Sequence, residues 1–209
     1  MGEANEICRM DAVTLAKRIR AKELSPTEVI EAVLTRMEEL EPHLHAFCTP
    51  TPDLARQEAR RIEKAILDGE KVGPLAGVPV GIKDLVCTAG VRTVSGSFAY
   101  EDFGPDEDDV VVERLKDAGA IIIGKTNVPE FGYSAVGHSP VFETTRNPWN
   151  LECTSGGSSA GSGAAVAAGL GPFAIGSDGG GSIRIRCTLR SLRHESLNGS
   201  SAALSGNEG

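Results

Sequence analysis

Residues able to carry hydrolytic chemistry gather in the run T-S-G-G-S-S-A-G-S-G-A-A-V-A-A-G-L-G-P-F-A-I-G-S-D-G-G-G-S-I-R, which spans Thr154 to Arg184. Two glycine–serine clusters here flank a small-residue helix and a short apolar strand. Three consecutive glycines, 179 to 181, let a backbone approach a ligand closely or adopt a positive φ. Their N–H groups can converge on one point, as an oxyanion hole requires. Ser182 follows directly and becomes a nucleophile once a base removes its proton.

A candidate base lies upstream in V-P-V-G-I-K, where Lys83 ends an apolar run. A lysine at a strand end is usually a solvated surface charge. The apolar run instead predicts burial, which disfavours the charged form of an amine and so favours a lysine that can accept a proton. We therefore interpret Lys83 as a functional residue.

The motifs together resemble the amidase signature family. G-G-S-S-A-G-S-G-A-A-V-A-A-G, G-S-D-G-G-G-S-I-R-I and the lysine segment P-L-A-G-V-P-V-G-I-K-D all match its pattern, with G-K-T-N-V-P-E-F and T-R-N-P-W-N between them. The resemblance covers roughly residues 8 to 185. It implies an α/β fold in which helices cover a mixed, twisted central sheet, here cut short before the sheet is complete. Residues 1–185 would form the N-terminal part of this single domain.

The resemblance also implies a role for each site residue. Lys83 would be the base, Ser158 a bridging serine held by a cis peptide bond, and Ser182 the nucleophile of a serine–serine–lysine relay. Asp178 and Arg184 would support the loop, by pairing with each other or with its N–H groups. The N–H groups of the oxyanion hole would come from Gly179, Gly180, Gly181 and Ser182.

The resemblance implies hydrolysis of a carboxylic amide to an acid and ammonia or an amine, through an acyl-enzyme, without a cofactor or metal. C-T-A-G-V-R-T-V-S-G-S and the stretch before N-P-W favour a stand-alone amidase acting on a small-molecule amide, with a homodimer as its expected assembly. The alternative is the amidase component of a tRNA-dependent Glu/Asp amidotransferase, which works in a complex. A third hypothesis is an inactive chain.

Composition excludes several classes. The chain has 209 residues, 40% of them hydrophobic, and a net charge of −8, which argues against direct nucleic-acid binding. No apolar run approaches the ~20 residues that span a bilayer, and the polar start lacks a secretory leader, so we expect a cytoplasmic protein. The five cysteines are scattered without ligand spacing, which predicts neither zinc nor disulfides, and a cysteine hydrolase using Cys153 or Cys187 is disfavoured.

A nucleotide-binding interpretation also fails. The stretch from Gly119 to Thr126 formally matches G-x-x-x-x-G-K-T, but its intervening A-I-I-I is a strand rather than a loop that opens a helix.

Periodicity and turn residues predict the elements that position these motifs. Ser25-Pro26-Thr27-Glu28 is a capping box with proline at the first helical position. We expect Ser155 to cap the small-residue helix that runs through 164–168. Further helices are expected over about residues 10–22, 26–42, 54–67 and 110–118, and strands over 78–83, 120–123 and 170–175. Alternating strands and helices predict an α/β sheet.

The last 24 residues, 186–209, depart from the family pattern. They are rich in Ser and Arg and offer no periodic apolar face, so we expect disorder. A one-base shift at the codon of Arg186 permits A-A-L-C-G-V-Y-G, the family's own continuation. We therefore interpret the tail as frameshifted, which sequencing of the coding DNA would test.

Overall fold

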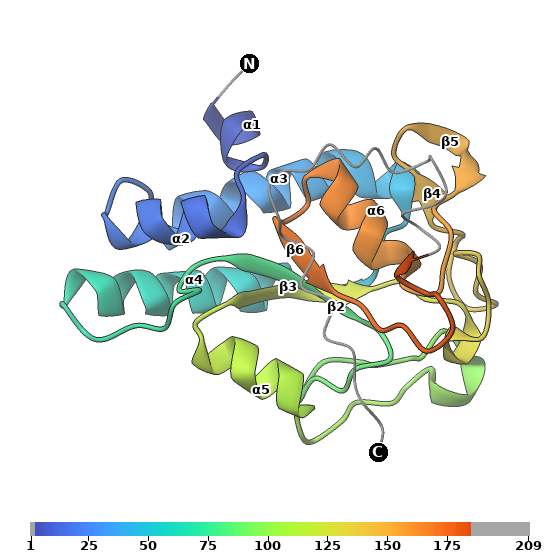
Figure 1. Ribbon diagram of the computed structural model, residues 1–209. Coiled ribbons are helices and arrows are strands. Elements are labelled where there is room, and N and C mark those ends of the chain that lie inside the picture. The colour runs from blue at the N-terminus through green and yellow to red at the C-terminus, as the bar shows by residue number, and fades with distance from the viewer. Residues whose placement is uncertain (1–2, 185–209) are drawn as a thin grey trace.

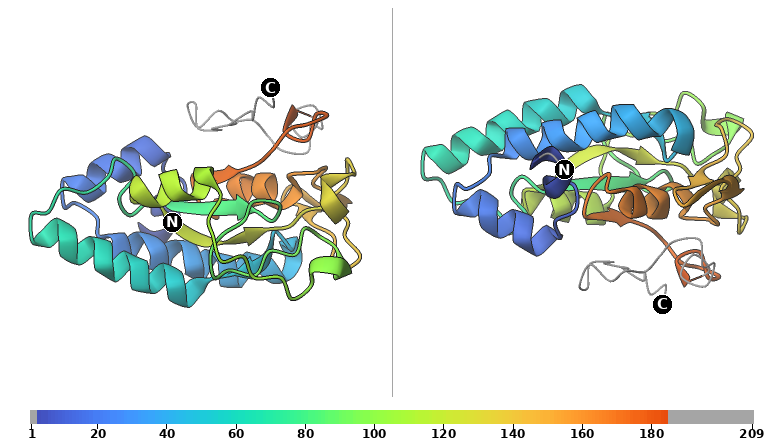
Figure 2. Two further views of the ribbon diagram at one scale, coloured as in Figure 1. Left: turned by 90° about the horizontal axis from the view of Figure 1, so that it is seen from below. Right: turned by 90° about the horizontal axis from the view of Figure 1, so that it is seen from above.

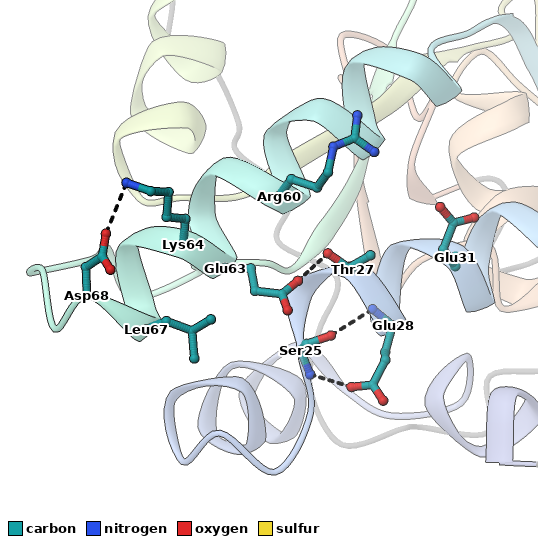
Figure 3. A pocket seen from close by; sticks show the side chains of 9 residues that line it. All are labelled: Ser25, Thr27, Glu28, Glu31, Arg60, Glu63, Lys64, Leu67 and Asp68. Carbon is teal, nitrogen blue, oxygen red and sulfur yellow. Dashed lines mark hydrogen bonds and ion pairs between the residues drawn. The ribbon is translucent and has the colours of Figure 1, made fainter.

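The computed structural model describes residues 3–184. The N-terminal part of the chain forms a helical layer. Its helices are α1 (Glu3–Ile7), α2 (Ala12–Arg20), α3 (Pro26–Leu44) and α4 (Pro52–Leu67). Local capping fixes where these helices begin. The Asp11 carboxylate accepts from the N–H groups of Val13 and Thr14 at the start of α2. Ser25 and Glu28 form the predicted capping box of α3, seen in Figure 3.

The central sheet has four strands in the order β1-β3-β2-β6. The strands are β1 (Phe47–Pro50), β2 (Pro79–Lys83), β3 (Ile121–Thr126) and β6 (Phe173–Ile175). Both β3 and β6 run parallel to β2, whereas β1 is antiparallel to β3. A separate two-stranded hairpin joins β4 (Arg146–Asn147) and β5 (Asn150–Thr154). The sheet is therefore mixed, as expected.

Helices cover both faces of the sheet. Figures 1 and 2 show α3 and α4 on one face, with α5 (Val110–Asp117) and α6 (Ala160–Ala168) on the other. The small residues of α6 allow a very close approach. A Cβ added to Gly161 would lie 2.1 Å from the Ala46 carbonyl oxygen and 2.3 Å from the Asn127 nitrogen. Because only glycine fits there, the serines that precede α6 are held against the strand ends.

The remaining elements are short. Single 3-10 turns form at η1 (Phe98–Tyr100) and η2 (Glu130–Gly132). Within residues 3–184, no helix is both long enough and apolar enough to cross a membrane.

Most expected elements are present, but α1, β4 and β5 were not expected, and the strand expected over 170–175 begins only at Phe173. Four further differences have local causes. α3 continues past Pro42 to Leu44, because the proline lies in the last turn and His45, with φ of 50°, ends the helix by donating to the Glu41 carbonyl at 3.0 Å. The capping prediction for Ser155 is wrong. α6 begins at Ala160 after Ser159, and the Ser155 hydroxyl is buried and donates to the carbonyl oxygens of Gly156 and Ala160.

Two strands also differ from expectation. β3 runs three residues further than expected and contains the whole G-K-T stretch, because Gly124 to Thr126 pair with both β1 and β2. β1 was not predicted, since four residues that end in proline carry too little periodicity to identify a strand. The frameshift and disorder proposed for residues 186–209 lie outside the described residues.

Candidate active site

Lys83 ends β2 inside the protein, with none of its surface exposed. Its Nζ donates to the Ser158 hydroxyl at 2.9 Å and to the Ser177 hydroxyl at 2.8 Å, and it lies 3.3 Å from the Ser177 carbonyl oxygen. The structure thus brings together a lysine and a serine that lie 75 residues apart in the chain. Both were predicted site residues.

Ser158 lies in the loop before α6 and is 2% exposed. The Gly157–Ser158 peptide bond is cis, which confirms the geometry expected for this serine. The loop is tightly enclosed, because a Cβ on Gly157 would lie 2.8 Å from the Val136 carbonyl oxygen. On the other side, a Cβ on Gly132 would lie 3.3 Å from the Ser158 hydroxyl. Glycines therefore make room for Ser158 on two sides.

Ser177 and Ser159 were not predicted to contribute to the site. Ser159 Oγ donates to the Ser177 carbonyl oxygen at 3.1 Å and accepts from the Ser177 N–H at 3.2 Å. This reciprocal contact holds the strand end after β6 against the start of α6, so that the Ser177 hydroxyl reaches Lys83. The available signal was the place of Ser177, directly after an apolar strand and at the start of the glycine loop.

Asp178 organises the glycine loop that follows. Its carboxylate accepts from the N–H groups of Gly181 at 2.6 Å and Ile183 at 3.1 Å, and from the Arg184 guanidinium at 3.0 and 2.8 Å. These bonds to Arg184, together with the loop N–H groups, hold the pKa of the Asp178 carboxyl well below its usual range. The carboxylate thus fixes the turn that carries Ser182.

Among the described residues, no hydrogen bond joins Ser182 to Lys83 or to Ser158. Ser182 is half-buried, and within residues 3–184 the Lys83 amine donates to Ser158 and Ser177 rather than to the Ser182 hydroxyl. One of the four expected oxyanion donors, the Gly181 N–H, is directed at Asp178. A Cβ on Gly179 or Gly180 would meet nothing within 4 Å, so this part of the loop is open.

Two other features lie apart from this site. Lys125 of the G-K-T stretch is fully buried inside β3, which is incompatible with a phosphate-binding loop. Figure 3 shows a groove between α3 and α4 on the surface of the helical layer. It is lined by Ser25, Thr27, Glu28, Glu31, Arg60, Glu63, Lys64, Leu67 and Asp68. Its side chains are distinct from those around Lys83.

The chain is similar to known amidases. The family model described as Amidase matches residues 28–192. The A component of glutamyl-tRNA(Gln) amidotransferase from Lachnoclostridium phytofermentans is 47% identical over 180 residues, covering 86% of this chain and 36% of the relative.

Two solved structures share the fold. A fatty acid amide hydrolase superposes with a TM-score of 0.85 and 30% identity, over 89% of this chain and 33% of that one. A bacterial aryl acylamidase of the amidase signature family gives a TM-score of 0.81 and 35% identity, over 85% of this chain and 37% of that one. The chain spans about a third of the length of these relatives. Because the family model matches most of the chain, the chain belongs to the amidase signature family.

Proposed function

We propose that this chain supplies the serine–serine–lysine machinery of an amidase that hydrolyses a carboxylic amide. The observation that carries the proposal is the 2.9 Å hydrogen bond between the buried Lys83 amine and the Ser158 hydroxyl. A lysine enclosed in this way can exchange a proton with a hydroxyl, and a hydroxyl can pass that proton on. Ser182 lies at the end of the adjoining loop and is the proposed nucleophile.

The reaction then runs in two stages. Ser158 takes the proton of the Ser182 hydroxyl and gives its own to the neutral Lys83 amine, while Ser182 Oγ attacks the amide carbonyl. The proton returns through Ser158 to the leaving nitrogen, the carbon–nitrogen bond breaks, and an acyl-enzyme remains on Ser182. Water, deprotonated by the same route, attacks the ester and releases the acid.

The developing oxyanion would be held by backbone N–H groups of the glycine loop. Gly179, Gly180 and Ser182 are the proposed donors, and the Gly181 N–H would join them only by leaving Asp178. Asp178 therefore supports the hole through the shape of the turn rather than through contact with substrate.

For the substrate class, we infer the amidotransferase interpretation in preference to a stand-alone amidase. Identity to the glutamyl-tRNA(Gln) amidotransferase relatives is 47–48% over about 180 residues, against 30–35% to the fatty acid amide hydrolase and the aryl acylamidase. This agreement along the chain outweighs the two short stretches that favoured a stand-alone enzyme. The enzyme would then work with partner proteins on glutamyl-tRNA(Gln), so co-purification of partners would support this choice and its absence would favour the stand-alone amidase.

The relay is tested in the enzyme that continues this chain to the length of its relatives. Ser182→Ala should abolish amide hydrolysis and labelling by a serine-directed fluorophosphonate. Ser158→Ala should reduce hydrolysis less, since a water molecule can partly replace a bridging hydroxyl. Wild-type turnover by Ser182→Ala, with its identity confirmed by mass spectrometry, would disprove the assignment.

A further inference from the structure

A second lysine is buried on the other face of the sheet from Lys83. The register of β2 and β3 pairs Lys83 with Thr126 and Ile82 with Lys125. Successive side chains on a strand point to opposite faces. The Thr126 hydroxyl meets Ser162 of α6 at 2.7 Å, so Lys83 and Thr126 share the α6 face and Lys125 lies on the opposite one.

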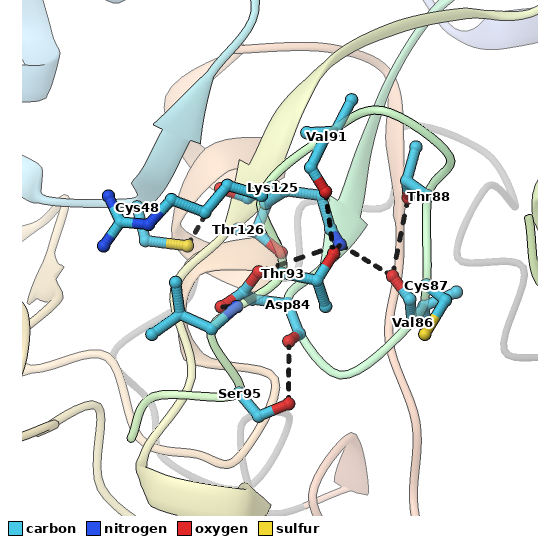
Figure 4. A network of polar contacts seen from close by, with 12 residues as sticks. Cys48, Asp84, Val86, Cys87, Thr88, Val91, Thr93, Ser95, Lys125 and Thr126 are labelled. Atoms are coloured by element: carbon cyan, nitrogen blue, oxygen red, sulfur yellow. Dashed lines mark hydrogen bonds and ion pairs between the residues drawn. The ribbon is translucent and has the colours of Figure 1, made fainter. Parts of the chain in front are cut away.

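The proposed mechanism does not use Lys125, whose amine donates hydrogen bonds to two groups and lies near a carboxylate. As Figure 4 shows, Nζ donates to the Val86 carbonyl oxygen at 2.6 Å and to the Thr93 hydroxyl at 2.5 Å. It also lies 3.7 Å from Oδ1 of Asp84, and both side chains are 0% exposed. Within the described residues, Asp84 Oδ1 has no hydrogen-bond partner, so the ammonium is its principal stabilising contact.

Asp84 follows Lys83 directly and connects this pair to the segment that contains Gly132. Its Oδ2 accepts from the Val94 N–H at 3.0 Å, and its carbonyl oxygen accepts from the Ser95 N–H at 3.2 Å. The Ser95 carbonyl oxygen in turn accepts from the Phe131 N–H at 2.8 Å. Phe131 precedes Gly132, the residue that flanks the Ser158 hydroxyl. A chain of contacts thus runs from Lys125 through Asp84 to the wall of the site.

The two groups of this pair are both buried, and each stabilises the opposite charge of the other. Burial lowers the pKa of Lys125 and raises that of Asp84, and each partner opposes the shift of the other. The other titratable groups that act on Lys125 are the thiols of Cys48 in β1 and Cys87 in the loop. Burial raises the pKa of both thiols, so they are uncharged at neutral pH. Asp178, which follows the Lys83 partner Ser177 in the chain, is bound to Arg184.

We propose that Asp84 and Lys125 are positioning residues for Lys83. From the opposite face of the sheet they fix the end of β2 and the wall beside Ser158, and their opposite charges cancel at the Lys83 amine. The effect of Asp84 and Lys125 on catalysis rests on the proposed function. The cancellation of charge is a property of the folded chain and can be measured without activity.

The experiment is an NMR titration of Lys83 in the chain labelled with ¹³Cε and ¹⁵Nζ lysine, assigned with Lys83→Met. Asp84→Asn removes the negative partner, so the midpoint of Lys83 should move to lower pH by roughly half to one unit. Lys125→Met removes the positive partner and should move the midpoint upward by a similar amount. The double variant Asp84→Asn/Lys125→Met should return it close to wild type.

Lys64→Met is the matched control, because its ion pair with Asp68 lies at the surface, where water screens it. It should leave the Lys83 midpoint unchanged. Unchanged midpoints in Asp84→Asn and Lys125→Met, or shifts in the same direction, would overturn the proposal. If Lys125→Met does not fold, Asp84→Asn and the double variant still decide the question.

Activity gives a separate readout in the enzyme of full family length. The acid limb of the pH profile of kcat/KM should follow the Lys83 midpoint in each variant. Opposite NMR shifts in an enzyme that lacks amidase activity would uphold this inference and reject the proposed function. Amidase activity without the NMR shifts would reject this inference and uphold the proposed function.

Discussion

Lys83 and Lys125 occupy neighbouring register positions on β2 and β3, are both fully buried and both donate to hydroxyl groups, but Lys125 also faces a carboxylate. Lys83 donates to the hydroxyl groups of Ser158 and Ser177, which can exchange protons with an amine. Lys125 faces the Asp84 carboxylate, which stabilises the ammonium form. Burial alone therefore does not mark a catalytic lysine. The chemistry of its partners separates a group that relays protons from one that keeps its charge.

The first prediction is that replacing Lys83 removes activity, whereas replacing Lys125 lowers stability. Lys83→Met in the full-length enzyme should lower kcat/KM for amide hydrolysis by at least ~10³-fold, because the relay loses its base. Its thermal unfolding should stay close to wild type, since Ser158 and Ser177 can retain water. Steady-state kinetics beside a melting curve measure both. Lys64→Met, at an exposed pair with Asp68, is the control and should change neither. Retention of more than a tenth of the activity by Lys83→Met would contradict the distinction.

The second prediction concerns stability. Lys125→Met should lower the free energy of unfolding by ~3–5 kcal/mol, because it leaves the Asp84 carboxylate buried without its cation. Urea denaturation followed by circular dichroism would measure the loss. Asp84→Asn/Lys125→Met should recover most of it, since neither charge then remains. A double variant as unstable as Lys125→Met would show that the ion pair is not the cause.

The sequence predicts the role of Lys83 better than that of Lys125. Lys83, Ser158 and the glycine loop stand in specific motifs, and capping rules place the start of α3 correctly because the residues concerned are neighbours in the chain. Lys125 lies in an equally visible motif, but its role depends on Asp84 and Thr93, which only the tertiary fold brings to it. The omission of Ser177 has the same cause. It meets a lysine 94 residues away, and no local pattern encodes that contact.

Glu41 differs from Asp84, because its buried carboxylate has no ion pair among the described residues. Glu41 Oε1 accepts from the Phe47 N–H at 2.7 Å, but Oε2 is buried and has no hydrogen-bond partner among the described residues. Burial raises the pKa of Glu41 from 4.5 to about 7. The folded state therefore binds a proton between these pH values that the unfolded state has released, and stability should fall as pH rises from about 4.5 to about 7.

The third prediction follows from this sign. The loss across that range should reach at most about 3 kcal/mol at 1.36 kcal/mol per unit. Glu41→Gln should flatten this part of the stability profile, as measured by urea denaturation at several pH values. Glu38→Gln, on the exposed side of the same helix, is the control and should leave the slope unchanged. An equal slope in wild type and Glu41→Gln would contradict the assignment.

The smallest expected effect tests how Lys83 is held between its hydroxyl partners. Ser177→Ala removes the 2.8 Å bond from Lys83 Nζ but keeps the Ser177 carbonyl oxygen at 3.3 Å and the Ser158 hydroxyl at 2.9 Å. Losing one of several bonds to the amine should cost about 1–2 kcal/mol, or roughly tenfold in kcat with little change in KM. Ser177→Thr keeps a hydroxyl and should retain most of the activity. Ser159→Ala, which removes the reciprocal contact to the Ser177 backbone, should fall between wild type and Ser177→Ala. If Ser177→Ala were as inactive as Lys83→Met, Ser177 would be part of the proton relay itself, and the relay would have to be redrawn around it.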